Sequence, residues 1–141
     1  MSLKIYGRGN MKEHNLTIQQ LRDQLSKRKN EWWKWNKQNP HVWELFEKYT
    51  FQAIESGLTS YSHWFIVNRI RWDFEVVTKS GEFKISNNYI AFYARLFHAY
   101  HPQHSGFFTI KPFKEEKMIE ELSARNVIYL NQLNYRICKP E

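Results

Sequence analysis

The stretch Asn39–Gly57, NPHVWELFEKYTFQAIESG, decides the fold class that the sequence predicts. Its first two residues are typical of a helix start, because asparagine can cap free N–H groups and proline at the first helical position loses no hydrogen bond. Glycine favours the position just after a helix, so we expect Gly57 to end the element. Apolar side chains recur between these signals at the spacing of an amphipathic helix, at Val42, Leu45, Phe46, Tyr49 and Ala53.

Cap signals predict a helix on each side of this one. Upstream, Thr17 and Gln20 form a capping-box pattern, which opens a helix that continues through a basic run to three tryptophans. Downstream, Ser60 or Ser62 is expected to cap a helix. We expect that helix to bury Phe65, Ile66, Ile70 and Phe74.

Two more helices are predicted toward the C-terminus. Ser86 or Asn87 is expected to cap the first, which runs over residues 88–101 and stops at Pro102. Its expected core face carries Ile90, Tyr93, Ala94 and Phe97. A charged amphipathic helix begins after Pro112, and the tail over residues 127–137 fits either a helix or a strand. The apolar side of the charged helix carries Met118, Ile119 and Leu122.

A small β element is expected between the helices. Residues 76–78 favour a strand, and residues 83–85 alternate at period two after a turn, so a hairpin or an irregular loop both fit. Residues 107–110 form a further strand candidate. We therefore predict a mainly α, compact helical domain with a helix-turn-helix or winged-helix-like arrangement. Residues 1–15 are expected to be a flexible lead-in, and residues 16–141 a single domain.

Positive charge is concentrated near the N-terminus. The 141 residues include 21 lysines and arginines against 14 acids, a formal net charge of +7. Residues 1–40 hold nine of these bases and three of the acids, so +6 of the charge lies there. A basic segment attached to a nearly neutral body favours nucleic-acid binding. The alternative is a solvated helix face that keeps the protein soluble.

Composition argues against membrane and secreted classes. The longest apolar run, residues 89–94, is far shorter than the ~20 residues of a membrane-spanning helix. Cys138 is the single cysteine, which rules out an intramolecular disulfide, and no charged-then-apolar leader opens the chain. We therefore expect a cytoplasmic protein that has no contact with a membrane.

Several short motifs lie between residues 32 and 113. They are Asn39–Phe46, Arg69–Trp72, Phe83–Tyr89, Tyr93–Arg95, His101-Pro102 and Gly106–Phe108. Over this range, a little over half of the chain, the sequence resembles a family of small proteins of unassigned function in bacterial genomes, often carried as phage or prophage genes. The resemblance implies a prophage origin and a single-domain fold, and it implies no activity.

Residues that could bind nucleic acid are cationic and lie close to aromatic side chains. Indole rings can stack on bases while cations neutralise phosphates, and the alternative is that the tryptophans anchor the helix to the core. We expect phosphate contacts from Lys27, Arg28, Lys29, Lys34, Arg69, Arg71, Lys84 and Arg95, and base or backbone contacts from Asn87 and Asn88. The expected partner is DNA more than RNA. The runner-up is a structural or interaction protein that engages a host or phage protein, and a homodimer is compatible with either function.

Two weaker chemical patterns remain, although we expect a non-enzymatic protein without a cofactor. Asp73, Glu82 and Lys84 would form a Mg²⁺-dependent nuclease site if residues 73–78 and 81–85 paired as strands. Solvated hairpin charges are the alternative. His98 and His101 have a spacing that allows a shared metal, with His104 and either His63 or His41 as further candidates. Their alternative role is to interact with exposed carbonyls at a helix C-terminus.

Overall fold

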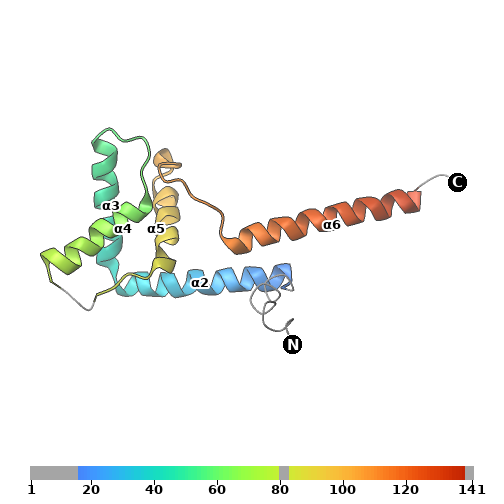
Figure 1. Ribbon diagram of the computed structural model, residues 1–141, viewed down its shortest axis with the longest axis horizontal. Coiled ribbons are helices and arrows are strands. Elements are labelled where there is room, and N and C mark those ends of the chain that lie inside the picture. The colour runs from blue at the N-terminus through green and yellow to red at the C-terminus, as the bar shows by residue number, and fades with distance from the viewer. Residues whose placement is uncertain (1–15, 80–82, 139–141) are drawn as a thin grey trace, which may run out of the picture. The chain divides into compact units, whose positions relative to one another are not determined.

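The computed structural model describes residues 16–79 and 83–138, with side chains up to residue 126. Its helices are α2 (Ile18–Gln38), α3 (Pro40–Glu55), α4 (His63–Trp72), α5 (Asn87–Tyr100) and α6 (Lys114–Cys138) (Figure 1). A π-helical turn, η1 (Asp73–Val77), continues α4, and a 3-10 turn, η2 (Pro102–His104), follows α5. The prediction of a mainly α protein is confirmed. None of the described helices is long and apolar enough to cross a membrane.

Contacts within the chain divide it into two compact units. One unit is residues 29–111, which contains the C-terminal half of α2 together with α3, α4 and α5. The other unit joins residues 1–28 to residues 112–141. A single domain over residues 16–141 stays a prediction. The expected flexible lead-in, residues 1–15, lies outside the described residues.

The helix starts follow the cap signals in the sequence. The capping box before α2 is confirmed, because the Thr17 N–H donates to Gln20 Oε1 at 2.9 Å and the Gln20 N–H donates to Thr17 Oγ1 at 3.1 Å. Of the alternatives left open, Ser62 rather than Ser60 caps α4, and Ser86 rather than Asn87 caps α5. The serine hydroxyls accept the N–H groups of Trp64, at 3.3 Å, and Asn88, at 3.2 Å.

Both ends of α3 lie where the sequence predicts them. Pro40 occupies the first turn and Asn39 the N-cap position, although the Asn39 amide donates to the Trp35 carbonyl at 2.9 Å and makes no cap bond. Gly57 follows the helix with φ of 100°. The Gly57 N–H donates to the Ile54 carbonyl at 3.0 Å, and the Leu58 N–H donates to the Ala53 carbonyl at 3.3 Å. These two hydrogen bonds form a Schellman motif.

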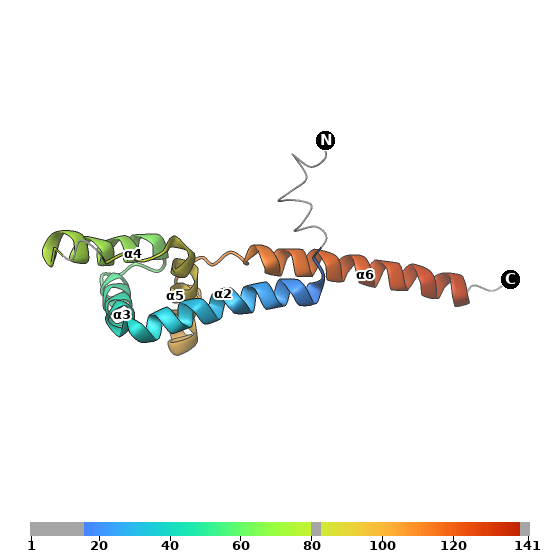
Figure 2. The same cartoon turned by 90° about the horizontal axis from the view of Figure 1, so that it is seen from below.

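The core of the 29–111 unit combines buried side chains of α3, α4 and α5 with Trp32 and Asn36 of α2. The Trp32 indole stacks on the Phe92 ring, with centroids 5.2 Å apart and planes 15° apart, and meets the edge of Tyr93. The Tyr93 hydroxyl donates to Asn36 Oδ1 at 3.0 Å, and burial raises the pKa of Tyr93 far above its usual 10.0. Figure 2 shows the C-terminal half of α2 beside α5. The predicted core face of α5 is confirmed, since Ile90, Tyr93, Ala94 and Phe97 are all buried.

Two sequence predictions in this unit are wrong. Residues 76–78, for which a hairpin strand and an irregular loop were both open, are not a strand. Val76 and Val77 lie in the π-helical turn, because α4 continues past Trp72 and the Thr78 N–H bonds the Asp73 carbonyl at 2.8 Å. Phe65, expected to point inward, is 58% exposed because its neighbours Ile66 and Ile70 face the core instead.

The remaining β prediction has little counterpart in the described residues, which contain no strand. Where residues 107–110 were expected to form one, Phe108 makes an isolated parallel bridge with Tyr61. The tail over residues 127–137, for which helix and strand were both open, belongs to α6.

Candidate nucleic-acid interface

The C-terminal half of α2 presents lysines around an exposed tryptophan. Lys29, Trp33 and Lys37 follow one another at one-turn spacing, so they share one side of the helix. All three are exposed, as is Lys34, and the Trp33 side chain is 37% exposed. Glu31 is also exposed, but two residues turn a helix by about 200°, which directs it away from Trp33. We call Lys29, Trp33, Lys34 and Lys37 the α2 lysine–tryptophan surface.

The neighbouring tryptophans of α2 have a different role. Trp32 is 3% exposed and belongs to the core described above. Trp35 is half-buried and contacts the rings of Tyr89 and Phe83, at 5.2 Å and 6.0 Å between centroids. The alternative expectation, that tryptophans anchor this helix, therefore holds for Trp32 and Trp35, whereas Trp33 is exposed, with its ring centroid 5.5 Å from that of Trp32.

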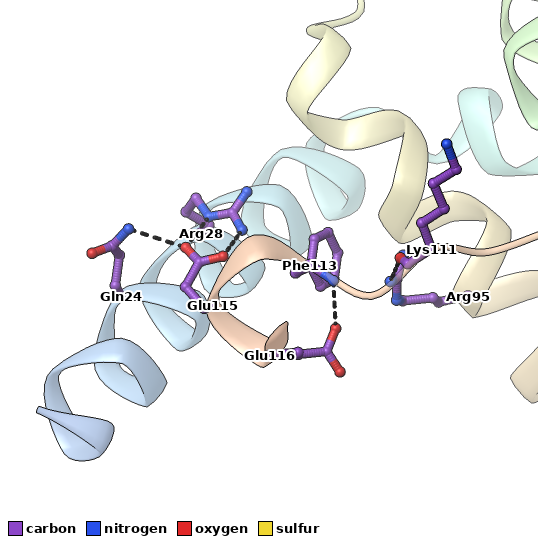
Figure 3. Close-up of polar contacts among 7 residues, drawn as sticks. All are labelled: Gln24, Arg28, Arg95, Lys111, Phe113, Glu115 and Glu116. Carbon is purple, nitrogen blue, oxygen red and sulfur yellow. Dashed lines mark hydrogen bonds and ion pairs between the residues drawn. The ribbon is translucent and has the colours of Figure 1, made fainter. Parts of the chain in front are cut away.

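Arg28, expected to bind phosphate, is engaged inside its own unit. Its Nη2 donates to Glu115 Oε1 at 2.7 Å, and its Nε donates to Glu115 Oε2 at 3.2 Å (Figure 3). Gln24 donates to the same carboxylate at 3.1 Å, and the guanidinium lies 5.2 Å from the Phe113 ring. The Glu115 side chain is fully buried, so Arg28 neutralises a buried charge. Lys27, by contrast, is exposed.

Arg71 is engaged within the 29–111 unit and connects α4 to the start of α5. Its Nη2 donates to the Ile85 carbonyl at 2.8 Å and to Asn87 Oδ1 at 2.7 Å. Its Nη1 donates to Asn68 Oδ1 at 3.1 Å. The structure thus brings two predicted contact residues, Arg71 and Asn87, together, but as partners of each other. Asn88 is exposed beside them.

The other predicted cations differ in their surroundings. Arg95 donates to the carbonyls of Ala91, at 3.1 Å, and Lys111, at 2.8 Å, and so holds the segment after α5 (Figure 3). Lys84 is exposed, and so is Arg69, whose guanidinium lies over a tyrosine ring.

The geometry proposed for a magnesium nuclease site is absent among the described residues. Asp73 lies in the π-helical turn, accepts a hydrogen bond from the Tyr49 hydroxyl, and lies 3.9 Å from Arg69. Burial and Asp73 together raise the pKa of Tyr49, which keeps its proton on oxygen. Glu82 lies outside the described residues. Because residues 73–77 are not a strand, the strand pairing that would align Asp73 with Lys84 does not form.

The histidines proposed as metal ligands are hydrogen-bonded to other groups. His98 Nε2 accepts the Phe108 N–H at 3.1 Å, and His101 Nε2 lies 2.6 Å from Glu47 Oε2. The rings of His104 and His41 pack against phenylalanines. In the part of the chain that the structure describes, no three His, Cys, Asp or Glu residues form a group that could hold a metal.

A cluster that the sequence did not reveal surrounds Phe108. His98 and His63 lie against its ring, at 5.7 Å and 5.8 Å between centroids, and Arg95 lies near both imidazoles. Burial, and next Arg95, lower the pKa of His98 below its usual 6.5, and the same causes with His98 lower that of His63. A neutral His98 is what the Phe108 N–H requires as an acceptor. No local spacing signals this cluster, because its members come from three separate segments.

We expect Arg28→Ala to lower the free energy of unfolding by about 2–3 kcal/mol, because it leaves the buried Glu115 carboxylate without its cation. Lys27→Ala, an exposed neighbour, is the matched control and should cost less than about 0.5 kcal/mol. Urea unfolding followed by circular dichroism measures both. Equal, small losses of unfolding free energy in the two variants would contradict the role of Arg28 as the partner of the buried Glu115 carboxylate.

Protonation of His98 should destabilise the 29–111 unit. Its pKa is depressed in the folded state, so the unfolded chain takes up the proton more readily as the pH falls through 6.5. The contribution to stability is therefore present above pH 6.5 and is lost as the pH falls from 6.5 toward the lower pKa of His98 in the folded protein. The measurement is the urea midpoint across this range. The His98→Leu variant should have a lower urea midpoint that changes less with pH. A midpoint that falls as steeply with pH as that of the unmodified protein would refute the role of His98.

Comparisons with known protein families, with curated proteins and with solved structures gave no significant match to this chain. The resemblance to prophage-associated proteins and the prophage origin it implies therefore stay predictions. The functional proposal rests on the residues and their geometry.

Proposed function

We propose that this protein binds single-stranded nucleic acid, DNA more than RNA, through the α2 lysine–tryptophan surface. The observation that carries the proposal is the exposure of Trp33 between Lys29 and Lys37, on the side of α2 that the core does not use. An exposed indole offers a face for a base of any sequence, and flanking ammonium groups attract the phosphates on either side of it. Such a surface favours strands whose bases are unpaired.

The spacing of the cations suits this mode of binding. Lys29 and Lys37 are eight residues apart, about 12 Å along the helix axis, with Trp33 midway. Lys34 adds a cation beside the indole. Each lysine acts as a hydrated point charge on a flexible stem, which fits contact with a mobile backbone better than reading of a base edge.

A major-groove reading helix, as in a helix-turn-helix or winged-helix protein, is supported less well. The helix in that position would be α5, which buries Ile90, Phe92, Tyr93, Ala94 and Phe97. Oδ1 of its first residue, Asn87, accepts a hydrogen bond from the Arg71 guanidinium. The proposal therefore assigns α5 to the core and nucleic-acid contact to α2.

A second candidate function is that of an interaction protein. Apolar side chains are exposed along α4 and the turn that continues it, where Phe65 is 58%, Trp72 53% and Val77 64% exposed. A group of exposed apolar side chains on the surface of a protein often marks a site of interaction with another protein. This observation does not involve α2, so both functions can coexist in one protein.

The nucleic-acid proposal predicts a steep salt dependence that comes from three lysines. Changing Lys29, Lys34 and Lys37 together to Ala should reduce the slope of log affinity against log salt for single-stranded DNA by about 2, since each phosphate contributes ~0.7. Fluorescence anisotropy of a labelled oligonucleotide across a salt series measures the slope.

The matched control changes three exposed lysines elsewhere, Lys48, Lys111 and Lys117, and removes the same charge. It should leave most of the slope in place. Trp33→Ala should weaken binding by about 1–3 kcal/mol at every salt concentration, because stacking is lost and charge is kept. Equal slopes for the two triple variants would refute the α2 surface.

A further inference from the structure

A groove of about 330 Å³ lies between the end of α3 and the start of α4. Its buried side is formed by Tyr49 and Ile66, and its exposed side by Leu58, Tyr61 and Phe65. The Tyr61 and Phe65 rings lie 5.5 Å apart between centroids and form a continuous aromatic edge. The volume of the groove is at the small end of the range for ligand pockets, so the groove can hold one or two apolar side chains of a partner.

The lining of this groove includes one cation. Among the described residues that line the groove, only Arg69 carries a formal charge. Its guanidinium lies 5.1 Å from the centre of the Tyr49 ring, and Lys48 lies 5.7 Å from the same ring. The Arg69 side chain is 55% exposed, and its ion pair with Asp73, at 3.9 Å, is longer than a direct hydrogen bond. Because more than half of the side chain is exposed, its guanidinium can donate a charge-assisted hydrogen bond to a carboxylate of a partner.

We propose that this groove docks an acidic peptide segment of a protein partner. A large apolar side chain of the peptide enters between Phe65 and Ile66, and a neighbouring carboxylate pairs with Arg69. This inference rests on the second candidate function, that of an interaction protein, and names the class of partner. It does not depend on nucleic-acid binding by α2.

The lining favours a peptide over a nucleic-acid strand. The rings of Tyr61 and Phe65 stand beside the aliphatic side chains of Ala53, Leu58 and Ile66, a mixed apolar lining that suits an apolar side chain of a peptide. Arg69, the one charged residue of the lining, lies beside Asp73 and gives little attraction for a chain of phosphates, whereas it suffices for one carboxylate. A second copy of this chain is also disfavoured, because each copy carries a net charge of +7.

The probes are two fluorescein-labelled ten-residue peptides, the acidic peptide NQLNEWLNQL and its twin NQLNQWLNQL, in which the single glutamate beside the tryptophan is replaced by its amide. Anisotropy gives their affinities for the full chain, and backbone amide NMR shifts locate the contact. We expect the acidic peptide to bind about 3- to 5-fold tighter than its twin, the value of one exposed charge pair. The largest shifts should fall on residues that line the groove.

Three variants separate docking from general stickiness. Arg69→Gln should remove the preference for the acidic peptide, and Phe65→Ser should weaken both peptides. Trp64→Ser is the matched control, because Trp64 is also an exposed aromatic of α4, 45% against 58% for Phe65, and does not line the groove. It should leave both affinities unchanged. Circular dichroism confirms that each variant is folded.

Several outcomes would overturn the docking proposal. Equal binding of the two peptides, shifts located away from the groove, or the same loss for Trp64→Ser as for Phe65→Ser would each do so. Larger shifts of the groove amides with single-stranded DNA than with the acidic peptide would reassign the groove to nucleic acid. None of these results bears on the salt dependence of the α2 lysines, so the two proposals fail separately.

Discussion

The burial of Trp32 against α5 determines which side of α2 faces solvent. Its indole is held by Phe92 and Tyr93, and one turn later Asn36 accepts the Tyr93 hydroxyl. Two contacts at positions i and i+4 leave a helix no freedom to rotate about its axis. Trp33 is then directed outward, since one residue turns the helix by about 100°. The exposure of Trp33 and its lysines thus follows from a packing contact.

The two kinds of basic residue are used in different ways. Arg28, Arg71 and Arg95 each donate at least two hydrogen bonds to groups of the protein itself, including a buried carboxylate and several backbone carbonyls. The lysines of the α2 surface remain exposed. The planar guanidinium suits fixed bidentate contacts, while the ammonium is more strongly hydrated. Among the described cations, these three arginines are therefore less available to a partner than the lysines of the α2 surface.

The helices were predictable because their signals are local. Cap residues and apolar spacing placed α3 and α5 within a residue or two, and the spacing of Leu21, Leu25 and Trp32 could have identified Trp32 as the buried tryptophan. The pair of Arg28 and Glu115 could not be foreseen, because 87 residues separate its members.

The strand prediction failed for a related reason. Val76 and Val77 have β-branched side chains, but strand propensity depends on a neighbouring strand that this chain does not supply in its described residues. For the candidate contact residues, the sequence supplied only the chemical type of each side chain. It could not tell which arginines the fold uses internally, since that depends on acceptors such as Ile85 and Lys111 that carry no sequence signal.

The most direct test of this account follows the indole N–H signals of the protein in a ¹⁵N-correlated NMR titration with single-stranded DNA. Trp32→Phe and Trp33→Phe variants assign the two signals. The account predicts that the Trp33 signal shifts progressively while that of the buried Trp32 stays in place. A shift of the Trp32 signal with none at Trp33 would contradict both the orientation of α2 and the function derived from it.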